Sequence, residues 1–112
     1  MRSARVRLED IAEAIDGIEG TMAGIDFAAF SESWQKRRAV ERGLEIVSEA
    51  SRGLSEDIRA AHPDVPWSQI AGIGNILRHE YHRAEPIIIW NIALEHIPAL
   101  SRAIKSLLAE GP

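Results

Sequence analysis

The chain has 112 residues, no cysteine and a formal net charge of −4. Its length fits a single domain over residues 1–112, and the lack of cysteine excludes disulfides and thiolate metal sites. A negative net charge gives no general attraction to nucleic acid. The apolar runs are too short to span a membrane. We therefore expect a cytoplasmic protein without a membrane partner.

The first predicted helix runs from about Ser3 to Met22, because apolar residues recur there at steps of three and four. Ser3 is a suitable N-cap, since its hydroxyl can accept a hydrogen bond from the first turn. Asp26 then caps a short turn from which Phe27 and Phe30 can reach the core. We therefore expect one long helix followed by a short aromatic anchor.

A second long helix starts near Ser31 or Ser33 and continues to about Leu54. One apolar stripe along it consists of Val40, Leu44, Val47 and Leu54. A second stripe, mostly of small residues, consists of Ala39, Gly43, Ile46 and Ala50. Two stripes imply two packing partners, which are the core of the domain and, in a dimer, another subunit.

The same helix carries a charged face at steps of three and four, formed by Arg38, Arg42, Glu45, Glu49 and Arg52. Such a face is typical of a solvated surface with ion pairs along the helix. The functional alternative is that this face lies opposite the third long helix and supplies charge to a shared cleft. In that case Glu49, which has small neighbours, is the carboxylate that we expect to point inward.

A short helix and a loop separate the second long helix from the third. Ser55 caps the short helix, which covers residues 56–61. Pro63 and Pro66 disfavour helix in the residues before them and mark the loop. The third long helix begins at residue 67 or 68, with its inner side formed by Ile70, Ile73, Leu77 and Tyr81.

After a turn over residues 82–85, Pro86 suits the first turn of a final helix. Pro98 lies inside that helix and should bend it, because proline cannot donate a backbone hydrogen bond. Four long amphipathic helices with short links predict an all-α fold. The expected architecture is an antiparallel up-down helical bundle of four long helices plus short helices.

The third long helix ends in the most informative stretch of the chain, residues 72–83. Asn75 and His79 are four residues apart and share one face, while Arg78 and His82 share the adjacent face. An imidazole can accept or donate a proton near pH 7, and a guanidinium can hold a phosphate through paired donors. An arginine, a histidine and an asparagine are chemically sufficient to propose cleavage of RNA by a scheme that requires no metal. His79 would act as base or acid, an arginine would stabilise the phosphorane, and Asn75 would orient the phosphate or the imidazole.

The same residues also have structural interpretations. Histidine and arginine are favoured at helix C-termini by the helix dipole, which can explain His79, His82 and Arg83. Tyr81 can be a half-buried core residue. A zinc-protease site needs two histidines one full turn apart, whereas His79 and His82 are three apart, so we expect no metal and no cofactor.

Two glycines, Gly72 and Gly74, lie inside the third helix, where each costs about 1 kcal/mol relative to alanine. Close approach of another backbone, within the bundle or across a dimer, would explain them. Together with the small-residue stripe of the second helix, they predict tight helix contacts and a symmetric homodimer.

Five segments in fixed order and spacing make a combined pattern: residues 7–11, 38–50, 66–72 and 74–81, and the start of the last helix up to Trp90. Over nearly its full length the chain thereby resembles the HepT-like proteins of the HEPN superfamily. The resemblance implies an all-α homodimer that is the toxin of a bacterial toxin–antitoxin pair and a metal-independent endoribonuclease.

The family motif is an arginine followed by a polar residue, a histidine separated from the arginine by four to six residues, and a tyrosine two further on. Asn75, His79 and Tyr81 match its last three elements. The resemblance also implies a partner, a minimal nucleotidyltransferase antitoxin. In some pairs the partner transfers AMP to the motif tyrosine, which here would be Tyr81.

The motif arginine should lie at position 72, 73 or 74, where this chain has Gly, Ile and Gly. Arg78, or Arg42 from the facing helix, is a candidate replacement. Two alternatives stay open beside the ribonuclease: a catalytically inactive HEPN-type module that docks the nucleotidyltransferase, and a purely structural helical dimer.

Overall fold

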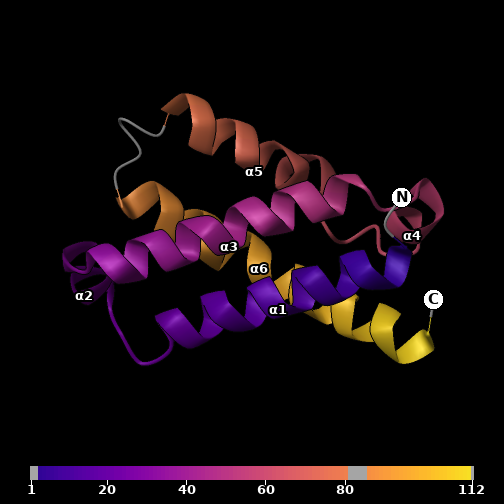
Figure 1. The fold of residues 1–112 in the computed structure, drawn as a ribbon, viewed down its shortest axis with the longest axis horizontal. Coiled ribbons are helices and arrows are strands. Elements are labelled where there is room, and N and C mark those ends of the chain that lie inside the picture. Colours follow the sequence, from indigo (N-terminus) through magenta and orange to yellow (C-terminus); the bar gives the residue numbers. More distant parts are fainter. Residues whose placement is uncertain (1–2, 81–85, 112) are drawn as a thin grey trace.

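The computed structural model describes residues 3–80 and 86–111, and all regular secondary structure within these ranges is α-helical. Its long helices are α1 (Ala4–Met22), α3 (Trp34–Arg52), α5 (Trp67–Glu80) and α6 (Pro86–Glu110) (Figure 1). Two short helices, α2 (Phe27–Glu32) and α4 (Glu56–Ala60), lie between them. The all-α fold class is confirmed, whereas a regular antiparallel up-down bundle stays a prediction.

The predicted helix starts are confirmed by their N-caps. Side chains of Ser3, Asp26, Ser33 and Ser55 each accept a hydrogen bond from the first turn of the helix that follows, at 3.2, 2.9, 3.1 and 3.2 Å. α3 ends at Arg52, two residues before the predicted end, because the N–H of Gly53 bonds to the carbonyl of Ala50 in a tighter turn. Capping chemistry thus sets the helix boundaries.

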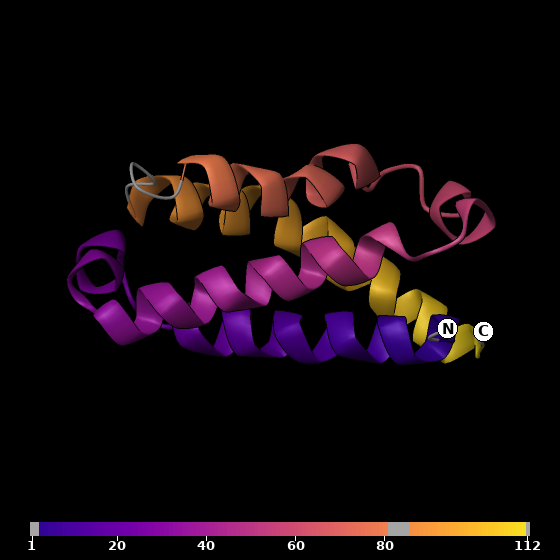
Figure 2. The ribbon, with the colours of Figure 1, turned by 45° about the horizontal axis from the view of Figure 1, so that its top comes forward.

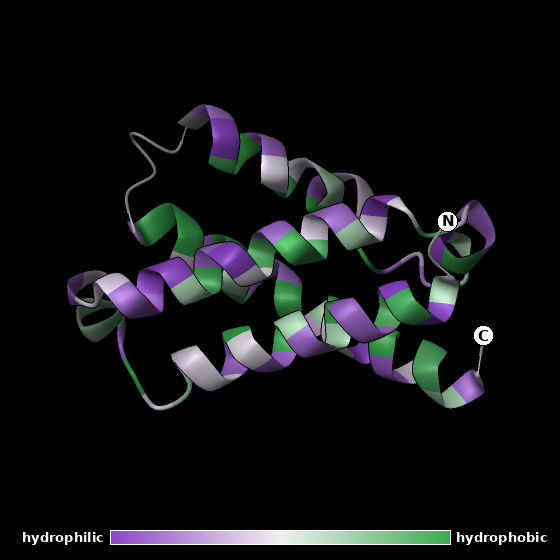
Figure 3. Ribbon diagram, in the orientation of Figure 1, coloured by the Kyte–Doolittle hydropathy of each residue, from purple (hydrophilic) through white to green (hydrophobic). Residues whose placement is uncertain are grey.

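α3 is the central helix of the fold. α1 packs along one side of α3 and α5 along the other, as the views in Figures 1 and 2 agree. α6 packs on α1 and α3, and α2 contacts both α3 and α6. Hydrophilic and hydrophobic stretches alternate along α3 in Figure 3, as expected for a helix with partners on two sides and solvent on a third.

The two predicted stripes of α3 are buried to different extents, since the apolar stripe lies in the core, whereas Ala39 of the small-residue stripe is exposed and Ile46 is half-buried. Val40, Leu44 and Val47 are fully buried in the core. In the small-residue stripe, Gly43 faces α1 so closely that an added Cβ would lie 2.6 Å from Cγ1 of Ile18. The second packing partner of α3 at Gly43 is therefore α1.

The N-terminal part of α6 is anchored by aromatic residues. The ring of Trp90 lies 5.1 Å from that of Phe30 and 5.9 Å from that of Phe27, measured between centroids. Phe30 is fully buried, so the predicted anchoring role of the aromatic turn is confirmed.

α6 combines a core face with an internal proline. Pro98 lies inside the helix, and the ribbon changes direction along its length in Figure 2, as expected for a proline-containing helix. Within the described ranges, α6 is the one helix long and apolar enough to cross a membrane by length and composition. Its apolar composition also serves the core, where its buried residues are Ile89, Ala93, Ile97, Leu100, Ser101, Ala103, Ile104 and Leu107.

Candidate functional site

Ser48 fixes α5 to α3. Its fully buried hydroxyl accepts a hydrogen bond from the backbone N–H of Gly74 at 3.0 Å and donates one to the carbonyl of Ala71 at 2.9 Å. Nε of Arg52, one turn further along α3, donates to the same carbonyl at 3.2 Å. These bonds set the register between the charged face of α3 and the polar end of α5.

An open groove of about 410 Å³ lies along this contact. The charged face of α3 forms one wall, and residues of α5 form the other. The lining residues are Arg38, Glu41, Arg42, Glu45, Glu49, Arg52, Gly74, Leu77 and Arg78. The charged face of α3 therefore lies opposite α5, although ion pairs along the helix are also present.

Two of the arginines in the groove are paired with carboxylates of α3. Arg38 bonds to Glu41 at 3.0 Å, and its guanidinium lies 5.4 Å from the ring centroid of Trp34. Arg42 bonds to Glu45 at 3.2 Å. Part of the positive charge in the groove is thus already neutralised by neighbouring residues.

The inward-facing carboxylate of α3 is Glu41. Its exposed fraction is 8 %, whereas Glu49 is exposed, so the expectation that Glu49 points inward is wrong. Glu41 lies seven residues before the buried Ser48 and so shares its side of the helix, while Glu49 is rotated by about 100° from Ser48. Burial raises the pKa of the Glu41 carboxyl, which Arg38 opposes and the carboxylate of Glu45 reinforces.

The candidate residues of α5 occupy two neighbouring faces. Arg78 lies four residues after Gly74, on the same side of the helix, and lines the groove. Asn75 and His79 are exposed on the next face and do not line it. The single chain therefore brings Arg78 together with Arg42 and Glu49, but not with the amide and the imidazole. Tyr81 lies outside the described residues.

The two glycines of α5 differ in their surroundings. A Cβ on Gly74 would lie 2.9 Å from Nη2 of Arg52, 3.2 Å from Oγ of Ser48 and 3.4 Å from Nη1 of Arg78. A Cβ on Gly72 would meet nothing within 4 Å. Close approach within the chain thus explains Gly74, through side chains of α3 instead of its backbone, and does not explain Gly72.

Sequence reasoning did not single out Arg52 as a site residue, although it placed Arg52 on the charged face of α3. The available signal was Ser48, because Ser48 and Arg52 are four apart and share a side of α3. Without the pairing of Ser48 with Gly74, however, the sequence does not say which part of α5 meets Arg52.

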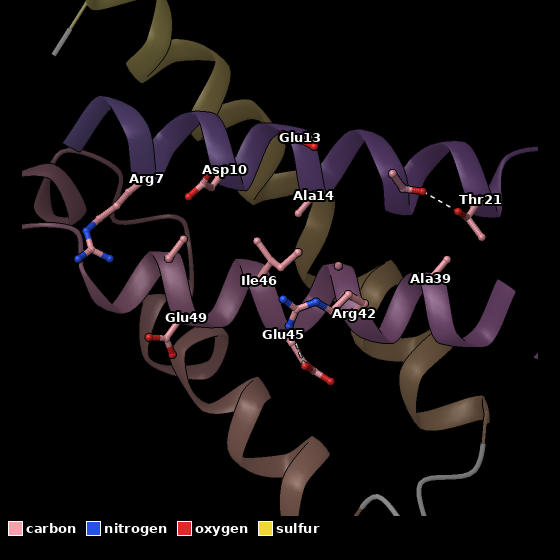
Figure 4. A pocket seen from close by; sticks show the side chains of 13 residues that line it. Arg7, Asp10, Glu13, Ala14, Thr21, Ala39, Arg42, Glu45, Ile46 and Glu49 are labelled. Atoms are coloured by element: carbon pink, nitrogen blue, oxygen red, sulfur yellow. Dashed lines mark hydrogen bonds and ion pairs between the residues drawn. The ribbon is translucent and has the colours of Figure 1, made fainter. Parts of the chain in front are cut away.

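A second groove, of about 690 Å³, runs between α1 and α3. Figure 4 shows charged side chains along it, including Arg7 and Asp10 from α1 and Arg42 and Glu49 from α3, around the apolar residues Ala14 and Ile46. None of Asn75, Arg78 and His79 lines this groove. Within residues 3–80 and 86–111, no group of three or more His, Asp or Glu side chains is placed to hold a metal.

Comparison with known proteins identifies the family. Residues 11–107 match the family described as "Ribonuclease HepT-like", and the chain belongs to this family. The chain is 35% identical over 104 residues to "Putative RNase MJ1380" of Methanocaldococcus jannaschii. The aligned residues make up 93% of this chain and 95% of that protein.

Two further relatives match at similar levels. The chain is 36% identical over 108 residues to "Putative RNase TTE0752" of Caldanaerobacter subterraneus subsp. tengcongensis, covering 96% of each protein. It is 37% identical over 106 residues to "Probable ribonuclease HepT" of Thermococcus cleftensis, covering 95% of this chain and 96% of that protein. No solved structure matches the chain significantly.

Proposed function

We propose that this chain is a metal-independent endoribonuclease that acts as a homodimer, with His79 as its acid–base residue. The observation that carries the proposal is the match of nearly the whole chain to a family of ribonucleases, together with the position of His79. Its imidazole is exposed at the end of α5, one residue from an arginine that lines a groove rich in guanidinium groups.

The proposed reaction uses the 2′-hydroxyl of RNA. His79 takes the proton from this hydroxyl, whose oxygen attacks the adjacent phosphorus, and the resulting imidazolium returns the proton to the departing 5′-oxygen. The products are a 2′,3′-cyclic phosphate and a 5′-hydroxyl. Guanidinium groups stabilise the negative charge on the phosphorane, and Asn75, four residues before His79, orients the phosphate or the imidazole.

A second copy of the chain would complete the cleft. Asn75 and His79 are exposed, and Ile76 between them keeps 36% of its surface exposed. An isoleucine beside two polar groups is well suited to an interface between protomers that covers the apolar side chain and leaves the imidazole at the edge.

The biological setting that we propose is a bacterial toxin–antitoxin pair in the cytoplasm. The partner would be a minimal nucleotidyltransferase that neutralises this chain, in some pairs by transferring AMP to the tyrosine at position 81. This proposal is supported by the match of Asn75, His79 and Tyr81 to the family motif.

A second candidate function is supported by Gly74. The family motif expects an arginine at positions 72–74, which this chain lacks. Loss of a group that stabilises the transition state typically costs about 100-fold or more in rate. The alternative is a catalytically inactive HEPN-type module that binds the nucleotidyltransferase.

An RNA cleavage assay distinguishes the two. Purified wild-type protein should cleave single-stranded RNA in the presence of EDTA, and His79→Ala should reduce the rate by about 10²-fold or more. His96→Ala, on α6, is the matched control and should cleave at the wild-type rate. Equal background cleavage by wild type and His79→Ala would reject the enzyme and favour the binding module.

A further inference from the structure

We infer that Arg52 and Arg78 form a binding site for a backbone phosphate of RNA, directly above the surface left free by Gly74. This inference rests on the proposed function for the identity of the ligand. The two guanidinium groups come from different helices, α3 and α5, and both lie beside the position that a Cβ on Gly74 would take. A Cβ there would be 2.9 Å from Nη2 of Arg52 and 3.4 Å from Nη1 of Arg78.

Gly74 leaves the surface beside the two guanidinium groups uncovered, because it has no side chain. Any other residue would place a Cβ within contact distance of both guanidinium groups and of Ser48. The position where the family motif can have an arginine is thus the position beside which Arg52 and Arg78 lie. Positive charge is present above position 74, but it is supplied by Arg52 and Arg78.

Arg52 is held in place from below. Its Nε donates to the carbonyl of Ala71 at 3.2 Å, and its Nη2 lies 3.5 Å from Oγ of Ser48. Ser48 is fully buried and is itself bonded to α5, so it holds the guanidinium of Arg52 at a fixed position. Arg52 nevertheless remains exposed to solvent. A positioned guanidinium can bind two phosphate oxygens with little loss of side-chain freedom.

The charges of the groove favour an anion at this point. Within the described ranges, neither Arg52 nor Arg78 forms an ion pair with a carboxylate, whereas Arg38 and Arg42 are paired with Glu41 and Glu45. The remaining carboxylate of the groove, Glu49, is exposed and forms no ion pair with either guanidinium. Two adjacent cations repel each other, and an anion between them removes this repulsion.

The ligand class follows from the shape and charge of the groove. It is open along its length, so it can admit one phosphate of a continuous strand, and it offers no stack of aromatic rings for bases. Recognition through phosphate alone predicts affinity that falls steeply with salt and depends little on base sequence.

Binding of a 2′-O-methyl RNA oligonucleotide, which cannot be cleaved through its 2′-oxygen, tests the site. The dissociation constant is measured across a series of salt concentrations for wild type, Arg52→Ala and Arg78→Ala. Each substitution should weaken binding and reduce the slope of log K against log salt by about 0.7 for one lost phosphate contact. Arg102→Ala on α6 removes the same charge outside the groove and should leave the slope unchanged.

A pair of glycine variants tests the same site without removing a charge. Gly74→Ala places a methyl group against both guanidinium groups and should weaken RNA binding, while alanine favours the helix and preserves folding. Gly72→Ala makes the same change two residues away, where nothing lies within 4 Å, and should bind RNA like wild type. Circular dichroism of each variant confirms folding.

The outcomes separate this site from the proposed function. Wild-type slopes for both Arg52→Ala and Arg78→Ala would overturn the site, as would an absence of RNA binding by wild type. The proposed ribonuclease function would still be supported if cleavage depends on His79. Conversely, reduced slopes for the arginine variants in a protein that cleaves no RNA would support the site and reject the enzyme.

Discussion

The backbone N–H of Gly74 donates a hydrogen bond to the hydroxyl of Ser48, 3.0 Å away on the neighbouring helix. The same hydroxyl donates to the carbonyl of Ala71, so one buried side chain satisfies a donor and an acceptor of α5. This contact fixes the register of α3 and α5. It thereby places Arg52 and Arg78 in one groove beside Gly74, and Asn75 and His79 on the outer face.

Ser48→Ala should destabilise the fold by about 1–3 kcal/mol, because it removes both hydrogen bonds inside a buried contact. Urea denaturation measures the change. Ser51→Ala is the control, since Ser51 is also buried but its hydroxyl donates only to the carbonyl of Ser48 in its own helix. Equal losses for the two variants would show that the bonds between helices add no stability.

Gly43→Ala should destabilise the contact between α1 and α3 by about 1–3 kcal/mol, because its Cβ would lie 2.6 Å from Cγ1 of Ile18 in a packed core. Gly20→Ala, where a Cβ meets nothing within 4 Å, should instead stabilise α1 by up to about 1 kcal/mol. Thermal denaturation of both variants checks the opposite signs. A stabilising Gly43→Ala would contradict the close packing of the two helices.

Glu41→Gln should make stability less dependent on pH. Burial raises the pKa of the Glu41 carboxyl, so the folded chain binds this proton more tightly than the unfolded chain. The charged carboxylate therefore costs stability at neutral pH. This cost disappears as pH falls through the raised pKa towards about 4.5, the ordinary value for glutamate.

The measurement is the difference in unfolding free energy between Glu41→Gln and wild type at pH 7.5 and pH 5. Glu41→Gln should be the more stable protein at pH 7.5, and its advantage should shrink at pH 5. Glu95→Gln, an exposed site on α6, serves as the control. An advantage that grows towards pH 5 would mean that the pairing with Arg38 outweighs burial.

Local signals in the sequence predicted much of the fold. The caps at Ser3, Asp26, Ser33 and Ser55 act within one turn, so residue type and spacing suffice to place the helix starts. The buried residues of α3 and α6 also follow from their periodicity. Contacts between segments that are distant in the sequence were harder to predict. The choice between Glu41 and Glu49 as the inward carboxylate depends on where α5 packs, which no local pattern encodes.

The candidate site shows the same division. The segment around Asn75 and His79 is conspicuous from its composition, and the family resemblance points to it. The role of Gly74 is not visible in the sequence, because it depends on the side chains of Ser48 and Arg52, 26 and 22 residues earlier in the chain. Only the packing of α5 on α3 shows that Arg52 and Arg78 lie beside Gly74, where the motif arginine is missing.

Ile76→Glu should weaken the proposed homodimer, because it replaces an apolar side chain between Asn75 and His79, on the proposed interface, with a charged one. Analytical ultracentrifugation should show a shift from dimer to monomer. Val6→Glu is a matched control at 37% exposure, compared with 36% for Ile76, and should leave the dimer unchanged. An unaltered dimer in Ile76→Glu, or a monomeric wild type, would move the proposed cleft away from this face.

The chemical ends of the RNA products test the central claim most directly. Attack by the 2′-hydroxyl with His79 as acid–base residue predicts 2′,3′-cyclic phosphate and 5′-hydroxyl ends in wild-type digests made with EDTA present, and little product from His79→Ala. Mass spectrometry of the fragments identifies these ends. Products with 3′-hydroxyl and 5′-phosphate ends, or product formation that is unchanged in His79→Ala, would contradict the account.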